Sequence, residues 1–160
     1  MKRGRNVLAE QPGLPGVART NFWTPDDLYN ELNAKYGPFT VDAAADESNA
    51  KCAKYFDESQ DGRFQEWTGR VWCNPPYKDL ITWVRKAYES TVGGGCEIAV
   101  ILIPAHTSTA WFHDYALPFA ELHWIRGKRR FGGLKDSAIM PSVAVVFMSD
   151  AERARRNPNS

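Results

Sequence analysis

The stretch VWCNPPYKDL, residues 71–80, decides how this 160-residue sequence folds. A hydrophobic run ends at Cys73, and the two prolines that follow Asn74 cannot donate the hydrogen bonds of a sheet ladder. The strand must therefore stop at this point. The chain turns through a rigid corner that presents the Asn74 carboxamide and the Tyr77 ring.

The segments after this corner predict a helix and a central strand. Apolar residues recur at helical spacing from Leu80 to Thr91, and the three glycines at 93–95 end the predicted helix. The segment EIAVILIP, residues 97–104, is a nearly continuous aliphatic run of strand length. Such a run is typical of a strand covered on both faces, so we expect it in the middle of the sheet.

The flanking segments complete an α/β pattern. Thr24 and Pro25 predict a helix that continues to Tyr36, with the Thr24 hydroxyl as its cap, and FTVDAAA at 39–45 predicts a short buried strand. The remaining predicted elements are a helix over about 107–115, an edge strand at 121–127 and a final strand at 142–148. This alternation predicts a mostly parallel sheet with helices on both faces and ligands beyond the carboxyl ends of the strands.

Length and composition fit one domain, since 43% of the residues are hydrophobic and the formal net charge is +1. We expect a flexible basic arm at 1–20, a domain at 21–150 and a basic tail at 151–160.

The sequence shows no apolar run of roughly 18 residues and no signal-peptide segment, so a cytoplasmic protein without a membrane span is expected. Three widely spaced cysteines and three histidines predict neither a disulfide framework nor a metal site. Four large aromatic residues are expected in the core: Trp83, Trp111, Phe112 and Trp124.

The corner carries groups that could hold a planar amine. The Asn74 side-chain oxygen and the Pro75 carbonyl can accept its two N–H bonds while Tyr77 stacks on its ring. Two acceptors orient the nitrogen toward an electrophile, which suits alkylation of an exocyclic amine. Because Asn74 is neutral, positioning rather than strong base catalysis would supply most of the rate.

The sequence resembles the phage-type DNA N6-adenine methyltransferases, which use S-adenosylmethionine. The resemblance rests on six blocks: WTPDDLYNELNAKYGPFTVDAAA (23–45), VWCNPPY (71–77), ITWVRKA (81–87), ILIPAHTSTAWFHDY (101–115), IRGKRRFGG (125–133) and PSVAVVF (141–147). It implies a Rossmann-like methyltransferase fold and transfer of a methyl group from S-adenosylmethionine to the exocyclic amine of a flipped adenine in DNA. A phage-encoded enzyme of this kind would act in the cytoplasm of the host.

The resemblance also implies roles for individual residues. The catalytic motif corresponds to Asn74, Pro75, Pro76 and Tyr77. The cofactor-binding residues correspond to Thr24 and Pro25, beside the methionine part, and to Asp42 and Ala43 after the first strand. Asp42 would bind either the cationic amine of the cofactor or its ribose. The acid that binds the ribose is left open among Asp46, Asp57 and Asp61. One departure is that VDAAADE stands where many methyltransferases carry a glycine-rich turn.

DNA is the partner that the resemblance implies, and flipping a base requires contacts that hold the phosphate backbone. The candidates are Arg126, Lys128, Arg129 and Arg130, in the loop before the last strand. The chain has no room for a separate target-recognition domain, so short sequence preference, a dimer partner or the basic arms would complete recognition. The alternatives are methylation of cytosine N4, an RNA adenine or a protein glutamine, and a non-catalytic nucleic-acid-binding module.

Overall fold

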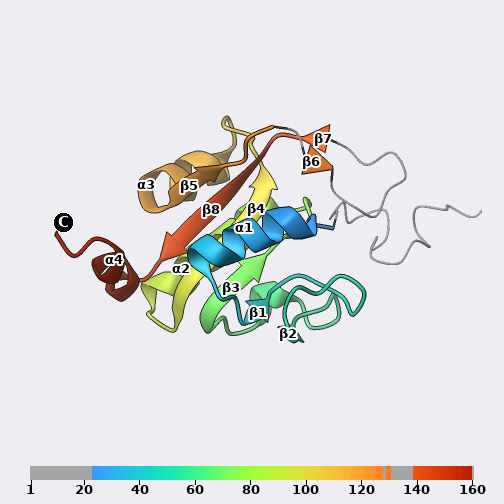
Figure 1. The fold of residues 1–160 in the computed structure, drawn as a ribbon, viewed down its shortest axis with the longest axis horizontal. Helices are drawn as coiled ribbons and strands as arrows, with labels where there is room; N and C mark the ends of the chain where they lie inside the picture. The colour runs from blue at the N-terminus through green and yellow to red at the C-terminus, as the bar shows by residue number, and fades with distance from the viewer. Residues whose placement is uncertain (1–22, 128, 131–138, 160) are drawn as a thin grey trace, which may run out of the picture.

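A six-stranded sheet forms the centre of the protein, whose computed structural model describes residues 23–127, 129–130 and 139–159 (Figure 1). The predicted basic arm at 1–20 lies outside the described residues. The strand order is β2-β1-β3-β4-β8-β5. The bounds of these strands are Lys54–Tyr55 for β2, Val41–Asp42 for β1, Gly69–Cys73 for β3, Cys96–Pro104 for β4, Ser142–Met148 for β8 and Glu121–Trp124 for β5.

The sheet is mixed, with parallel pairing on one side of β4 and antiparallel pairing on the other. Strands β2, β1, β3 and β4 are parallel, whereas β8 runs antiparallel to both β4 and β5. The carboxyl ends of β1, β3, β4 and β5 therefore meet at one edge of the sheet. Strands β6 (Arg129–Arg130) and β7 (Ile139–Met140) form a separate antiparallel pair.

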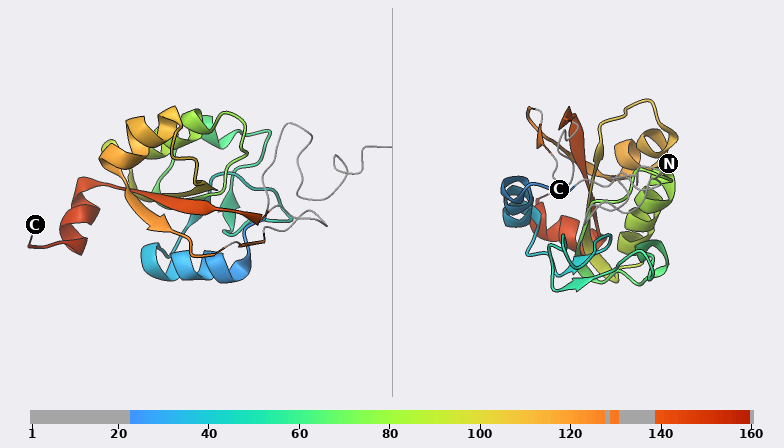
Figure 2. Two further views of the ribbon diagram at one scale, coloured as in Figure 1. Left: turned by 90° about the horizontal axis from the view of Figure 1, so that it is seen from above. Right: turned by 90° about the vertical axis from the view of Figure 1, so that its right-hand side faces the viewer.

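Helices cover both faces of the sheet, as the sequence predicts (Figure 2). Helix α1 (Asp26–Tyr36) lies on one face. The other face carries α2 (Leu80–Val92), the π-helical turn η3 (Phe112–Ala116) and α3 (Leu117–Phe119). The short 3-10 turn η2 (Gly62–Phe64) precedes β3, and α4 (Asp150–Arg156) ends the described fold.

Strand β4 separates two hydrophobic clusters and confirms the predicted central strand. Its alternate residues Ile98, Val100 and Leu102 pack in the cluster that contains Leu28 and Leu32 of α1. The residues between them, Ala99, Ile101 and Ile103, pack in the cluster on the α2 side. Because both faces of β4 are buried, no polar position interrupts its aliphatic run.

Two local predictions were wrong. Helix α1 begins at Asp26 with Pro25 as its N-cap residue, and no side chain caps it. The Thr24 hydroxyl instead accepts a hydrogen bond from the side-chain amide of Asn74. Trp124 is not in the core: it is 55% exposed, because it ends the edge strand β5 and has a neighbouring strand on one side only.

The segment expected as a basic tail begins with a docked helix. Ser149 caps α4 by accepting the backbone N–H of Glu152. The Glu152 side chain is 4% exposed and pairs with Arg70 of β3 at 3.2 Å and with Arg156 at 2.9 Å, and it also pairs with Arg155. This ion-pair cluster fastens α4 to the sheet. Among the described helices, none has the length and apolar character needed to cross a membrane.

Replacing Glu152 by glutamine should destabilise the protein. Burial raises the pKa of Glu152, but the hydrogen bond from Arg156 and the charges of Arg70 and Arg155 outweigh it and hold that pKa below its ordinary value. The carboxylate therefore stabilises the fold above the unfolded-state pKa, and this contribution is lost as pH falls through the lowered folded-state pKa. Glu152→Gln should lower the unfolding free energy at pH 7 by about 1 to 3 kcal/mol in urea titrations.

Glu89→Gln, at an exposed position on α2, is the matched control and should leave the unfolding midpoint nearly unchanged. The deficit of Glu152→Gln should shrink under acidic conditions. A deficit that persisted at pH 3 would contradict the role of the charge.

Candidate active site

A buried hydrogen bond joins the proline corner to the segment before α1. The Asn74 Nδ2 donates to the Thr24 Oγ1 at 3.0 Å, across 50 residues of sequence. Both side chains are buried, and Asn74 is 7% exposed. Because the amide nitrogen is the donor in this bond, the orientation of the carboxamide and of its acceptor oxygen is fixed.

The rest of the corner follows β3 at the carboxyl edge. Pro75 is buried, whereas Pro76 and Tyr77 are partly buried. Pro76 lines a cavity that lies between the 56–63 segment and the start of α2. Tyr77 packs against the hydrophobic cluster on the α1 side, and burial raises the pKa of its phenol, so the ring stays neutral at physiological pH. The structure thus brings the four predicted catalytic residues to one edge.

Asp42 lies at the end of β1 and holds the loop that follows it. Its carboxylate accepts the backbone N–H of Ala44 at 3.3 Å and that of Lys51 at 3.0 Å. Burial raises the pKa of Asp42 to about 6, although these two hydrogen bonds oppose the shift. Ala43 is fully buried and donates its N–H to the Trp72 carbonyl, while Ala44 reaches the cavities.

Three cavities follow the carboxyl edge and share lining residues. The first, of about 520 Å³, lies between the 56–63 segment and the start of α2; the second, of about 580 Å³, lies between the start of α1 and residues 48–51. A narrow gap of about 10 Å³ lies between them: Ala44 lines the gap and the first cavity, and Thr24 lines the gap and the second. Asp42 and Asn74 line this gap. We call the three cavities together the edge trough.

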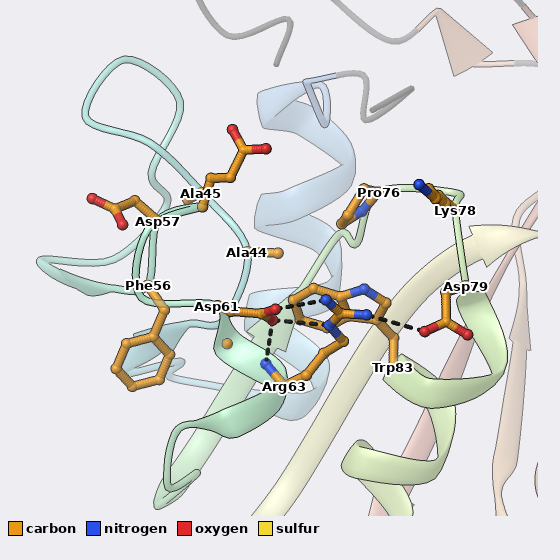
Figure 3. Close-up of a pocket in the computed structure, with 12 residues that line it drawn as sticks. Ala44, Ala45, Phe56, Asp57, Asp61, Arg63, Pro76, Lys78, Asp79 and Trp83 are labelled. Carbon is orange, nitrogen blue, oxygen red and sulfur yellow. Dashed lines mark hydrogen bonds and ion pairs between the residues drawn. The ribbon is translucent and has the colours of Figure 1, made fainter. Parts of the chain in front are cut away.

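Ion pairs cross the first cavity (Figure 3). Arg63 Nη2 contacts Asp61 Oδ2 at 2.6 Å, and Arg63 Nη1 contacts Asp79 Oδ2 at 3.0 Å. The hydrogen bond from Arg63 lowers the pKa of Asp61, and the guanidinium carbon lies 5.7 Å from the centroid of the Trp83 ring. These contacts tie η2 to the start of α2.

The structure separates the three acids that the sequence left open for ribose binding. Asp57 and Asp61 line the first cavity. Asp57 Oδ1 accepts hydrogen bonds from the Ser59 hydroxyl and the Gln60 backbone N–H. Asp46 is not among the residues that line the trough and forms a turn with Ser48 and Asn49 instead.

Sequence reasoning missed Gly62, where two segments make a close approach. A Cβ on Gly62 would lie 1.9 Å from the Ala43 carbonyl oxygen and 3.3 Å from the Trp83 ring. The glycine that the turn after β1 lacks is therefore supplied from η2, which packs directly against that turn. The aspartate-glycine pair at 61–62 was the sequence signal for this position. The other missed lining residues include Trp23, Lys51, Phe56, Arg63 and Trp83.

The predicted DNA contacts are only partly described. Arg126 is exposed and follows β5 at the carboxyl edge, beside the exposed Trp124. Arg129 and Arg130 form strand β6, but their side chains and Lys128 lie outside the described residues. Within the part of the chain that the structure describes, no group of three or more His, Cys, Asp or Glu side chains could hold a metal ion.

Comparisons with known proteins identify close sequence relatives and a shared fold. The profile of the DNA N-6-adenine-methyltransferase (Dam) family matches residues 14–153. A DNA N-6-adenine-methyltransferase of Escherichia phage T1 is 35% identical over 114 residues, which cover 69% of this chain and 47% of the relative. Another, of Haemophilus phage HP1 (strain HP1c1), is 29% identical over 116 residues, 68% of this chain and 66% of the relative. The chain thus spans about half the length of the phage T1 relative.

The crystal structure of the 23S rRNA methyltransferase ErmE superposes with a TM-score of 0.53 at 14% sequence identity, covering 82% of this chain and 71% of ErmE. This likeness confirms the predicted Rossmann-like methyltransferase fold.

Gly62→Ala should disturb the trough and the fold together. The added methyl group has to displace a backbone carbonyl, so we expect a loss of about 1 to 3 kcal/mol of unfolding free energy, measured by urea denaturation. Gly95→Ala is the matched control, because its Cβ would meet only the Trp67 carbonyl oxygen at 3.9 Å. Equal stabilities for the two variants would disprove the close approach.

Proposed function

Because this chain belongs to the DNA N-6-adenine-methyltransferase (Dam) family, we propose that it transfers a methyl group from S-adenosylmethionine to the N6 amine of adenine in DNA. The observation that carries the proposal is the position of Asn74, which lines the narrow gap of the edge trough at the corner that follows β3. A phage-encoded enzyme with DNA as its substrate would act in the cytoplasm of the host cell.

The edge trough suits S-adenosylmethionine in size and in chemistry. Phe56 and Trp83 supply apolar surface in the first cavity, where Asp57 and Asp61 supply acceptors for ribose hydroxyls. The gap has the small Ala44, and beyond it Asp42 supplies negative charge beside Thr24. We assign the adenosine part to the first cavity and the amino-acid part to the gap and the second cavity, whose lining includes Pro25. Ala43 shapes this path through its backbone.

Positioning of the target amine is the task of the corner. When bound, the cofactor supplies an electrophilic methyl carbon on its sulfonium. We assign the Asn74 Oδ1 and the Pro75 carbonyl to accept the N–H bonds of the amine, and Tyr77 to stack on the base. Thr24 fixes the Asn74 amide in the orientation that this task requires.

A DNA-binding surface along the carboxyl edge follows from the same arrangement. Trp124 ends β5, three strand spacings from β3 in the sheet order, which corresponds to about 14 Å. This separation spans about four base-pair steps of B-DNA. We propose that the exposed Trp124 and Arg126, together with Lys128, Arg129 and Arg130, contact the nucleotides that flank the flipped base.

Methyl transfer is the direct test. Purified protein with radiolabelled S-adenosylmethionine should place label on adenine N6 of duplex DNA, detected by nucleoside analysis. Label on cytosine, RNA or protein, with none on DNA adenine, would contradict the proposal. Asn74→Ala should lower the single-turnover rate by about 100-fold or more, because one of the two acceptors is lost.

Asn74→Asp is the matched variant. An aspartate at this position keeps an acceptor oxygen, and the Thr24 hydroxyl can donate to it, so more activity should remain than in Asn74→Ala. An Asn74→Ala variant with full activity would refute the assigned role.

Cofactor affinity should depend on the protonation of Asp42. Its pKa of about 6 means that the group is neutral below that pH and an anion above it. The cofactor ammonium, with a pKa of about 7.7 to 8.0, needs the anion, so affinity should fall about tenfold from pH 7 to pH 5. Calorimetry across this range measures the effect.

Asp42→Asn should bind more weakly at pH 7 and should lose most of this dependence. A parent protein whose affinity is constant from pH 5 to pH 7 would contradict the role given to Asp42.

A further inference from the structure

A buried donor in the edge trough has no assigned role. The indole nitrogen Nε1 of Trp23 is buried and has no hydrogen-bond partner among the described residues. Trp23 lines both the narrow gap and the second cavity. An indole N–H can only donate, and a buried donor without an acceptor is costly to the fold. The position therefore calls for an acceptor supplied by a ligand.

Lys51 brings a positive charge to the same place. It lines the same two cavities as Trp23, and its side chain is 16% exposed. Its Nζ contacts the Asp26 Oδ1 at 2.6 Å, and Asp26 is on the outer surface with 87% of its side chain exposed. An ammonium group has three N–H donors, so this ion pair orients Lys51 without exhausting it.

The gap and the second cavity together thus offer two donors for an anion and one acid for a cation. Trp23 and Lys51 line both cavities, and Asp42, whose carboxylate is buried, lines the gap. An α-amino acid in its zwitterionic form carries both complementary charges on one carbon. This pairing matches the methionine end of the cofactor better than it matches a phosphate, which has no cation for Asp42.

We propose that the Trp23 indole N–H and the Lys51 ammonium bind the carboxylate of the cofactor's amino-acid end, opposite Asp42. The assignment rests on the proposed function, since it takes S-adenosylmethionine as the ligand. It adds Trp23 and Lys51 to the proposed cofactor-binding residues, and both lie outside the proline corner and the turn after β1. A hydrogen bond to a charged group is among the stronger ones, so each residue should contribute about tenfold or more to affinity.

Decarboxylated S-adenosylmethionine isolates this contact, because it keeps the sulfonium and the amine but lacks the carboxylate. We would measure the affinity of both ligands by calorimetry for the parent chain, Trp23→Phe and Lys51→Met, without DNA. The matched controls are Trp124→Phe, at an exposed indole outside the trough, and Lys35→Met, which removes an ion-paired lysine at the far end of α1.

The expected result is selective. Trp23→Phe and Lys51→Met should each bind S-adenosylmethionine about tenfold or more weakly, but should bind the decarboxylated ligand as the parent does. The two controls should match the parent with both ligands. Trp23→Phe should not lower the melting temperature of the free protein, because its N–H has no partner among the described residues.

Two results would overturn the proposal. If the variants weakened both ligands equally, or neither ligand, while the parent bound S-adenosylmethionine, the carboxylate contact would be wrong and the proposed function would stand. If the parent bound neither ligand, the cofactor assignment and this inference would fail together.

Discussion

The hydrogen bond between Asn74 and Thr24 is the constraint on which the site depends. It joins the corner after β3 to the segment that leads into α1, and both partners are buried. Because a buried polar group without a partner is costly, each segment fixes the other. The same pair closes one side of the gap in the edge trough, so the contact that fastens α1 to the sheet also sets the entrance to the reacting corner.

The sequence predicted those features that depend on neighbours along the chain. The aliphatic run of β4 is buried on both faces because helices cover both faces, and the period-two division of its side chains follows from strand geometry. Two prolines end β3 wherever it lies in the sheet. The corner and its address at the carboxyl edge could therefore be predicted without coordinates.

Features that depend on distant segments could not be predicted in this way. Thr24 before Pro25 has the pattern of a helix cap, but a buried amide 50 residues away takes its hydroxyl. The chain around Gly62 does not itself require a glycine; the Ala43 carbonyl, which belongs to a distant segment, leaves no space for a side chain there. The charge of Glu152 looks like part of a solvated tail until three arginines surround it. In each case the partner, rather than the local pattern, decides the structure.

The acids along the trough are held in different ways, and this difference assigns them different tasks. Arg63 pairs with both Asp61 and Asp79, which holds these two acids in place, while Asp57 adds a further acceptor for the hydroxyl groups of a nucleoside. The Asp42 carboxylate accepts backbone N–H groups, and burial raises its pKa. A cation beside Asp42 would recover the energy that burial of its charge costs. The trough therefore favours a ligand with hydroxyl groups at one end and a cation beside Asp42 at the other, and Asn74 lines the gap together with Asp42.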